Sequence, residues 1–432
     1  MTRLTSALAL TATVATAPAI AENRIDVIRP DAPELATHGD YAVGVRTLTL
    51  TDPGRIDILN VTDEAIPTYD RPLTVELWYP AAAGTEPGTL YDTVIRNNDP
   101  AQLHGMASRD ASPITGETFP VVVISHGYPG NRMLMSHLGE NLASKGYVTV
   151  SIDHTDSTYS DQAAFGSTLV NRPLDQRFVL DQMGNASVIG DDIAAIADTS
   201  MAAVLGYSMG GYGALIYGGA GVTQTSVDYT WGAPRGLLGA HLAGSDTHKT
   251  LTDDPRVKAL IAIGPWGRNL NFWDADGMAG INRPLMLMAG SVDDVSVYSA
   301  MRAMFDEATG TDRHLLTFNH ANHNAAAPMP APAEAIAATP KGEQSPADHY
   351  LDAVWDARRM NNITQHFATA FLDLHLKGDS DKAAFLALVP NADDGIASLE
   401  ENGTPKADHS YWTGFAARTA TGLRFETKMR GN

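Results

Sequence analysis

The sequence contains no cysteine. Disulfide bonds, thiol nucleophiles and thiolate metal sites are therefore excluded. Positive charge is also scarce, because 30 lysines and arginines stand against 50 aspartates and glutamates, a formal net charge of −20. This balance argues against nucleic acids and anionic membrane surfaces as partners. Beyond residue 21 the chain lacks a run of roughly 18 apolar residues, so we expect no membrane span.

The first 21 residues have the pattern of a secretory signal. Arg3 supplies a positive charge, a short and weakly apolar stretch follows at 4–14, and Ala19-Ile20-Ala21 has the A-x-A form of a cleavage site. We expect the mature chain to begin near Glu22 and the protein to be exported, to the periplasm or the extracellular space. A disordered leader rich in alanine and threonine is the alternative.

The most informative run of the chain is Gly206-Tyr207-Ser208-Met209-Gly210. A small, apolar stretch typical of a buried strand precedes it, and the Gly/Ala-rich residues 209–217 can begin a helix. A serine between two glycines at a strand-to-helix turn is the pattern of a nucleophile elbow. The turn is so tight that only residues without Cβ fit easily two positions before and after the serine. An incidental serine in an ordinary strand-helix turn is the alternative.

A coarse pattern of strands and helices surrounds this run. Apolar runs typical of strands buried on both faces occur at 120–125, 147–152, 200–205, 256–263, 285–289 and 315–318. A helical pattern at about 132–144 connects the first two, which indicates a parallel βαβ unit. The remaining expected elements are alternating strands at 43–50 and 73–80, a turn at 52–54, a loop at 81–118, a polar loop at 153–173, and helices at about 174–183 and 348–377.

The length of 432 residues allows two domains or one elaborated α/β domain. We expect an N-terminal arm at 22–40, an α/β catalytic domain at 41–388 and a C-terminal extension at 389–432. Within the catalytic domain, residues 221–254 form an insertion after the helix that follows Ser208. Long insertions at such a place usually roof a pocket, so this one is a candidate lid.

A serine hydroxyl becomes a nucleophile when a histidine removes its proton and an acid holds that histidine. After an elbow of this kind, the acid and the histidine should follow in that order at the ends of later strands. Asp293 follows the strand at 285–289, and His323 follows the strand at 315–318. We therefore predict a catalytic triad of Ser208, His323 and Asp293.

Each member of this prediction has an alternative. Asp294 could be the acid while Asp293 caps the next helix, although the reverse is favoured. His320 lies closest to its strand end, and we expect it to be a neighbour of the base rather than the base itself. His154 is the other histidine at a strand end, and it is best interpreted as a hydrogen-bonded loop histidine.

Ester hydrolysis also needs backbone N–H donors that stabilise the oxyanion. The residue after the nucleophile, Met209, supplies one donor, and the turn Ser125-His126-Gly127-Tyr128 is placed to supply the other. We assign the second donor to the N–H of Tyr128. The alternative is that His126-Gly127 is simply a turn.

Together these residues resemble the α/β-hydrolase superfamily: Ile124-Ser125-His126-Gly127, the run around Ser208, Gly290-x-x-Asp293 and the late His323. Within it they are similar to the platelet-activating-factor acetylhydrolase and dienelactone-hydrolase-like group. Further landmarks of that group are Leu77-Trp78-Tyr79-Pro80 and the run from Asn171 to Asp181, and the resemblance covers roughly residues 41–380. It implies an α/β-hydrolase fold, with a mostly parallel central sheet flanked by helices, and a serine esterase without metal or other cofactor.

The chain departs from the acetylhydrolases at one position. Gly264 stands where their acid would be, so the acid must come from the next strand end, at Asp293, as in dienelactone hydrolases and cutinases. This makes phospholipid acetylhydrolase activity doubtful. Pro265-Trp266, with Tyr128 and Met209, instead resembles the aromatic-lined cleft of bacterial cutinase-like polyester hydrolases. The resemblance implies that Tyr128 and Trp266 bind substrate, and ordinary packing of Trp266 is the alternative.

The function expected from these residues is hydrolysis of small-molecule or polymeric carboxylic esters through an acyl-enzyme. A cutinase-like polyester or lipid hydrolase is the first alternative. Less favoured are a phospholipid acetylhydrolase, a dienelactone hydrolase, a peptidase with the same triad and a non-catalytic binding protein. The acidic pairs at 393–394 and at 274 and 276 complete no EF-hand loop, so we expect no metal.

Overall fold

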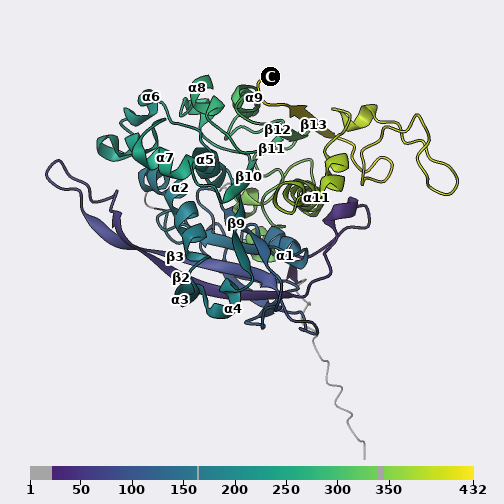
Figure 1. The fold of residues 1–432 in the computed structure, drawn as a ribbon, viewed down its shortest axis with the longest axis horizontal. Coiled ribbons are helices and arrows are strands. Elements are labelled where there is room, and N and C mark those ends of the chain that lie inside the picture. The colour runs from purple at the N-terminus through teal and green to yellow at the C-terminus, as the bar shows by residue number, and fades with distance from the viewer. Residues whose placement is uncertain (1–21, 163–164, 339–344) are drawn as a thin grey trace, which may run out of the picture.

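The computed structural model describes residues 22–162, 165–338 and 345–432, so the expected signal peptide at 1–21 lies outside the described residues. At its centre is a ten-stranded sheet with the order β13-β12-β11-β10-β9-β7-β8-β3-β2-β6. Helices lie on both faces of this sheet (Figure 1). Its strands are β2 (Val43–Ile56), β3 (Thr68–Pro80), β6 (Ser108–Arg109), β7 (Phe119–Ser125), β8 (Val148–Asp153), β9 (Ala197–Tyr207), β10 (Val257–Ile263), β11 (Leu285–Gly290), β12 (Arg313–Phe318) and β13 (Leu423–Lys428).

The middle of the sheet, from β12 to β8, is parallel, and β13 and β3 border it as antiparallel strands. Parallel strands are joined by crossovers that cover both faces, so their side chains must be apolar on both sides. In β7, Val121 and Val123 belong to one apolar cluster, whereas Val122 and Ile124 belong to the other. The expected α/β sheet, mostly parallel and flanked by helices, is confirmed.

Two layers of helices cover these clusters. Helices α1 and α11 pack on the face that contains Val122, and α2, α5, α7, α8 and α9 pack on the opposite face. The helices are α1 (Ser136–Ser144), α2 (Phe165–Gln182), α3 (Ala186–Ile189), α4 (Asp191–Ala194), α5 (Met209–Tyr217), α6 (Gln224–Val227), α7 (Asp246–Thr252), α8 (Ala275–Ala279), α9 (Tyr298–Glu307), α10 (Ala333–Ala337) and α11 (Ala357–Leu376).

The long β2–β3 hairpin and a small second sheet differ from the prediction. The turn predicted at 52–54 lies inside β2, where the pairing with β3 shifts register between Asp52 and Arg55. The loop predicted at 81–118 contains β4 (Leu90–Val94) and β5 (Pro100–His104), and β5 pairs with both β4 and β1 (Asn23–Arg24) in a three-stranded sheet. A bulge absorbs the residues that favour a turn, and short polar strands resemble loops in composition.

Helix α2 begins earlier than predicted and continues through Pro173, so the polar loop expected at 153–173 ends sooner. A proline inside a helix leaves the carbonyl four residues before it without its N–H partner. Here that carbonyl belongs to Leu169, and the Tyr212 hydroxyl donates a hydrogen bond to it at 3.1 Å. A tertiary contact with α5 therefore replaces the missing bond.

Helix α11 begins later than the predicted helix at 348–377. Its N-terminal cap is Asp356, whose side chain accepts a hydrogen bond from the N–H of Arg359 at 2.9 Å. Asp348 instead takes part in a capping box on a separate 3₁₀ turn, Pro346–His349. Two aspartates thus have the local chemistry of a cap, and the helix predicted from about 348 starts at the first of them rather than at the second.

The terminal segments contact the central sheet and its helices. Strand β13 pairs with β12, and residues Glu34–Ala36 pack against α11. The expected boundaries between the N-terminal arm, the catalytic domain and the C-terminal extension, after residues 40 and 388, stay predictions. The lid expected at 221–254 also stays a prediction. No helix in the described part of the chain is long and apolar enough to cross a membrane.

The burial of His137 on α1 predicts that the free energy of unfolding depends on pH. The residue is buried, neither ring nitrogen has a hydrogen-bond partner among the described residues, and burial lowers its pKa to about 3. The unfolded chain, with a histidine pKa of about 6.5, binds this proton between pH 6.5 and 3, whereas the folded chain does not. Stability from this residue is therefore complete above about pH 6.5 and is lost as the pH falls, by about 1.4 kcal/mol per pH unit.

As the pH falls from 6 to 4, the free energy of unfolding of His137→Leu should decrease less steeply than that of the wild type. The two slopes should differ by about 1.4 kcal/mol per pH unit. Urea unfolding at a series of pH values measures this slope. His320→Leu, at an exposed position, is the matched control. An unchanged slope in His137→Leu would show that His137 is protonated in the folded protein.

Candidate active site

Ser208 stands at the sharp turn between β9 and α5. Its φ is +53°, in the left-handed region that residues other than glycine rarely adopt. Glycine is required on both sides: a Cβ on Gly206 would lie 2.1 Å from the Gly210 oxygen, and one on Gly210 would lie 1.9 Å from the Ser125 oxygen. The predicted elbow geometry is present, and it places Ser208 at the carboxyl ends of the parallel strands.

The three predicted triad residues meet at the ends of β9, β11 and β12. The His323 Nε2 lies 3.0 Å from the Ser208 Oγ, and the His323 Nδ1 lies 2.8 Å from the Asp293 Oδ2. The other carboxylate oxygen of Asp293 accepts hydrogen bonds from the backbone N–H groups of Val295 and Ser296, at 2.9 and 2.8 Å. These bonds hold the carboxylate in one orientation, so the imidazole bridges an acid and a hydroxyl.

The alternative residues lie elsewhere. Asp294 is exposed and lines a pocket that His323 also borders, and the hydrogen bond to the His323 Nδ1 comes from Asp293 instead. Neither aspartate caps α9, because that helix begins after Val297 without a side-chain cap, so the expected capping role is wrong. His320 is exposed, and its backbone N–H donates to the Ser291 Oγ at 2.7 Å. His154 is buried in a different polar network.

Two further residues lie against the imidazole, Gly264 and Tyr207, and a third, Ser296, is hydrogen-bonded to Gly264. A Cβ on Gly264 would lie 3.4 Å from the His323 ring, and the Gly264 carbonyl accepts a hydrogen bond from the Ser296 hydroxyl at 2.7 Å. The Tyr207 ring lies 5.1 Å from the imidazole, centre to centre. Burial, and then the charge of Asp293, raise the pKa of the Tyr207 hydroxyl, so it stays neutral. Sequence reasoning missed Tyr207 and Ser296, and only the position of Tyr207 beside the nucleophile offered a signal.

The loop that follows β7 lies against the nucleophile. A Cβ on Gly127 would lie 3.3 Å from the Ser208 Cβ. Among the described residues, no acceptor is hydrogen-bonded to the backbone N–H of Tyr128 or Met209. Two backbone donors beside Ser208 are therefore available to an oxygen bound there.

An aromatic cluster lies next to this loop, made of Tyr128, Phe165, Trp231 and Trp266. The centre of the Phe165 ring lies 5.1 Å from that of Tyr128 and 5.3 Å from that of Trp266. Trp231 comes from the 221–254 insertion, lies 6.4 Å from Trp266 and is 47% exposed. The insertion therefore contributes an aromatic ring to the surface near Tyr128.

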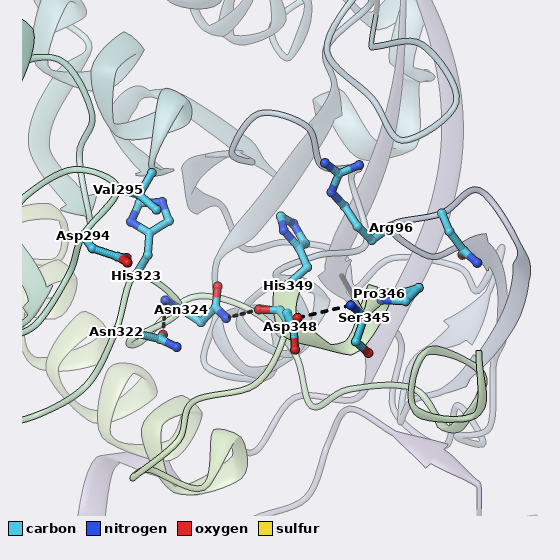
Figure 2. Close-up of a pocket in the computed structure, with 11 residues that line it drawn as sticks. Arg96, Asp294, Val295, Asn322, His323, Asn324, Ser345, Pro346, Asp348 and His349 are labelled. Carbon is cyan, nitrogen blue, oxygen red and sulfur yellow. Dashed lines mark hydrogen bonds between the residues drawn. The ribbon is translucent and has the colours of Figure 1, made fainter. Parts of the chain in front are cut away.

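A polar pocket of about 500 Å³ borders the imidazole on another side. Figure 2 shows His323 at one end of this pocket and Arg96 and Ser345 at the other. Burial, and then the charge of Arg96, lower the pKa of His349 to about 3. The pocket is lined by Arg96, Asn97, Asp294, Val295, Asn322, His323, Asn324, Ser345, Pro346, Asp348 and His349.

Known proteins resemble the chain at three levels. A family model described as PETase, PET hydrolase-like, matches residues 111–227, which include Tyr128 and Ser208. Cutinase est1 of Thermobifida alba is 25% identical over 213 residues, 49% of this chain and 55% of the relative. Cutinase cut1 of Thermobifida fusca is 24% identical over 184 residues, 43% of this chain and 42% of the relative. The chain thus spans about half the length of the curated relatives it matches.

A solved structure extends the likeness to most of the chain. The ferulic acid esterase of Streptomyces cinnamoneus superposes with a TM-score of 0.57 and 23% identity, over 83% of this chain and 94% of that one. The chain has the α/β-hydrolase fold. At this identity the likeness concerns the fold alone, and the chemistry depends on the residues around Ser208.

Proposed function

We propose that the protein is an exported carboxylic-ester hydrolase that acts through an acyl-enzyme on Ser208. The observation that carries the proposal is the pair of hydrogen bonds of His323, at 3.0 Å to the Ser208 hydroxyl and 2.8 Å to the Asp293 carboxylate. A base between a hydroxyl and an ionised acid is the arrangement that activates serine. Export rests on the signal-like residues 1–21.

In the proposed mechanism, the Ser208 Oγ attacks the ester carbonyl carbon while the His323 Nε2 removes its proton. Asp293 stabilises the imidazolium that forms. The carbonyl oxygen becomes negatively charged and accepts hydrogen bonds from the N–H groups of Tyr128 and Met209, which can lower the barrier by several kcal/mol. His323 then donates its proton to the departing alcohol oxygen as the C–O bond breaks. Water enters, is deprotonated by His323, attacks the acyl-enzyme and releases the carboxylic acid with regeneration of Ser208.

The aromatic cluster supports a second, narrower candidate, a cutinase-like hydrolase of aromatic polyesters or lipids. Tyr128 and Trp266 offer apolar rings beside the proposed oxyanion donors, where the acyl group of an ester would lie. The polar pocket borders His323, the residue that must protonate the alcohol, and therefore suits a hydrophilic leaving group. The resemblance to dienelactone hydrolases points to the same acid position, whereas Gly264 weakens the case for a phospholipid acetylhydrolase.

The test of the proposed function is a substrate panel with the full chain. It contains p-nitrophenyl esters from acetyl to long-chain acyl groups, a lactone, a p-nitroanilide and an aromatic polyester film. We expect steady hydrolysis of the short esters and formation of an acyl adduct that mass spectrometry locates on Ser208. A chain that cleaves none of these esters, or is acylated elsewhere, contradicts the proposal. Preference for the anilide would assign a peptidase.

Trp266→Ala tests whether the aromatic cluster binds the acyl group. We expect kcat/KM for p-nitrophenyl benzoate to fall about threefold to tenfold more than for p-nitrophenyl acetate, because one aromatic contact contributes about 0.5–1.5 kcal/mol. The acetate serves as the internal control, and the melting temperature detects lost packing. Equal losses on both substrates would assign Trp266 to packing alone.

A further inference from the structure

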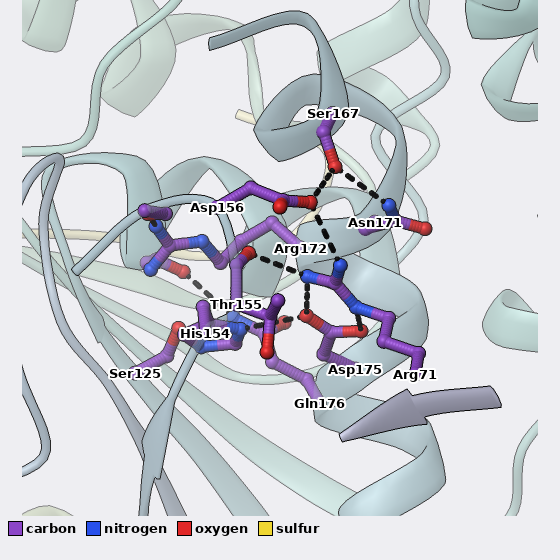
Figure 3. Close-up of polar contacts among 12 residues, drawn as sticks. Arg71, Ser125, His154, Thr155, Asp156, Ser167, Asn171, Arg172, Asp175 and Gln176 are labelled. Atoms are coloured by element: carbon purple, nitrogen blue, oxygen red, sulfur yellow. Dashed lines mark hydrogen bonds and ion pairs between the residues drawn. The ribbon is translucent and has the colours of Figure 1, made fainter. Parts of the chain in front are cut away.

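A second set of serine, histidine and aspartate lies beneath the loop that carries Tyr128. The Ser125 Oγ lies 2.8 Å from the His154 Nε2, and the His154 Nδ1 lies 3.0 Å from the Asp175 Oδ2 (Figure 3). Side chains at these positions are at most 1% exposed, so no substrate reaches them. The order of groups is that of a catalytic triad, but the place is the interior behind the oxyanion loop.

The charges of this network determine its protons. Although burial favours the neutral acid, Arg71, bound to Asp175 at 2.9 and 3.0 Å, keeps the pKa of Asp175 well below its usual range. Burial, and then Arg172, lower the pKa of His154 to about 3. An ionised carboxylate only accepts hydrogen bonds, so the neutral His154 donates from Nδ1 and accepts from the Ser125 hydroxyl at Nε2. The end of β7 is thereby tied to α2.

Arg172, on the same helix, binds the loop itself. Its guanidinium donates to the carbonyl oxygen of His126, to that of Gly127 at 3.3 Å, and to the Ser157 hydroxyl. These three acceptors are neutral, and no carboxylate among the described residues forms an ion pair with Arg172. Burial lowers the pKa of Arg172 to about 9, which leaves it charged at pH 7. A buried cation that has only neutral acceptors lowers the free energy of unfolding. The presence of Arg172 here therefore suggests a role in function rather than in stability.

The geometry of the Gly127–Tyr128 peptide indicates this role. In a trans peptide the C=O and N–H bonds point in opposite directions. The Gly127 carbonyl points toward Arg172, and the His126 ring donates to it as well, from Nδ1 at 2.6 Å. The N–H of the same peptide belongs to Tyr128 and therefore points the other way, away from Arg172. The peptide lies beside the nucleophile, because a Cβ on Gly127 would lie 3.3 Å from the Ser208 Cβ. Fixing the carbonyl fixes the direction of the proposed oxyanion donor.

The next turn of α2 contacts the helix that carries the other proposed oxyanion donor, Met209. The Gln176 Nε2 donates to the Gly210 oxygen at 3.0 Å, in the first turn of α5, which begins with Met209. Arg172 and Gln176 are four residues apart and share one face of α2. That face approaches α5 closely, because a Cβ on Gly213 would lie 2.7 Å from both side chains.

We propose that Arg172 is a positioning residue for the oxyanion hole: it holds the Gly127–Tyr128 peptide so that the Tyr128 N–H faces the oxygen of the tetrahedral intermediate. The inference rests on the proposed ester hydrolysis. Ser125, His154 and Asp175 anchor the base of the loop, and Gln176 anchors the elbow helix from the same face of α2. The positive charge behind the peptide also aligns its dipole with the oxyanion.

The test compares Arg172→Met with the wild type on p-nitrophenyl butyrate and on its thionoester, in which sulfur replaces the carbonyl oxygen. Loss of one oxyanion donor lowers kcat by about 10²–10³-fold. We expect a kcat loss of about 10²-fold on the ester, a KM changed by less than about threefold, and a much smaller kcat loss on the thionoester, whose sulfur gains little from the donors. Arg172→Lys, which keeps a cation able to reach one carbonyl, should restore part of the ester rate.

Arg55→Met is the matched control, because Arg55 binds Asp175 at 3.1 Å and its other partners among the described residues, Asn171 and Asp52, lie outside the loop that carries Tyr128. It should lower the melting temperature and leave the ester-to-thionoester ratio unchanged. Equal losses of Arg172→Met on both substrates, or an unchanged ester rate, overturn the inference while the proposed function stands. If Arg172→Met does not fold, Arg172→Lys is judged by the same ratio. A wild-type chain inactive on the ester contradicts the proposed function instead.

Discussion

Ser208→Ala is expected to lower kcat for p-nitrophenyl butyrate by about 10⁶-fold, the scale of loss when the nucleophile of a triad is removed. The substitution deletes the only atom that can form the acyl-enzyme and leaves the donors of Tyr128 and Met209 in place. A residual rate above that of water should therefore remain. Among the described residues, the Ser208 side chain makes a single hydrogen bond, to His323 at 3.0 Å, so the fold should persist.

Steady-state kinetics and intact-mass detection of the acyl adduct measure this effect. Ser187→Ala, at an exposed position on α3, is the matched control and should keep the wild-type rate. The melting temperatures of both variants should stay close to that of the wild type. A Ser208→Ala enzyme with a tenth of the wild-type kcat would exclude Ser208 as the nucleophile.

Asp293→Asn should lower kcat by about 10⁴-fold, and the reason lies in the turn that binds the carboxylate. The backbone N–H groups of Val295 and Ser296 donate to Oδ1, so an asparagine would keep its oxygen there. Its NH₂ group would then face the His323 Nδ1, which would have to accept. The proton of the neutral ring would move to Nε2, and Nε2 could no longer accept the proton of Ser208.

Asp294→Asn is the control for this experiment. Asp294 is the next residue in the chain and has the same charge, but it is exposed, whereas Asp293 is buried and hydrogen-bonded to the imidazole. We expect its kcat to stay within about twofold of the wild type, since surface charges are screened by solvent. If Asp294→Asn proves to be the more damaging change, the acid of the triad has been assigned to the wrong residue.

The convergence of Ser208, Asp293 and His323 could be expected from the sequence because each follows an apolar strand. Parallel strands end at the same edge of a sheet, so local order along the chain becomes proximity in space. The need for glycine at 206 could be predicted similarly, since a Cβ there would meet Gly210 within the same turn, whereas at Gly210 the Cβ would meet the distant Ser125. Chemistry that depends on strand ends is therefore predictable without coordinates.

The network around Arg172 was not predictable in this way. Its partners at 126, 127 and 157 lie 15 to 46 residues away, and none belongs to a pattern of spacing. The same holds for Ser296, whose hydroxyl reaches the Gly264 carbonyl across two strand ends. His154 could be expected to be hydrogen-bonded, but its partner Asp175 comes from a helix whose start was misplaced. Contacts that depend on how helices pack need the fold first.

The position of β13 has a consequence for biosynthesis. The strand that leads into His323 has its neighbour on one side only after residues 423–428 have been made, more than a hundred positions later. Such late pairing slows folding, because a long loop must close before the contact forms. The outer edge of β12 therefore stays unpaired until synthesis is almost complete, and the sheet that carries His323 is finished only by the last strand of the chain.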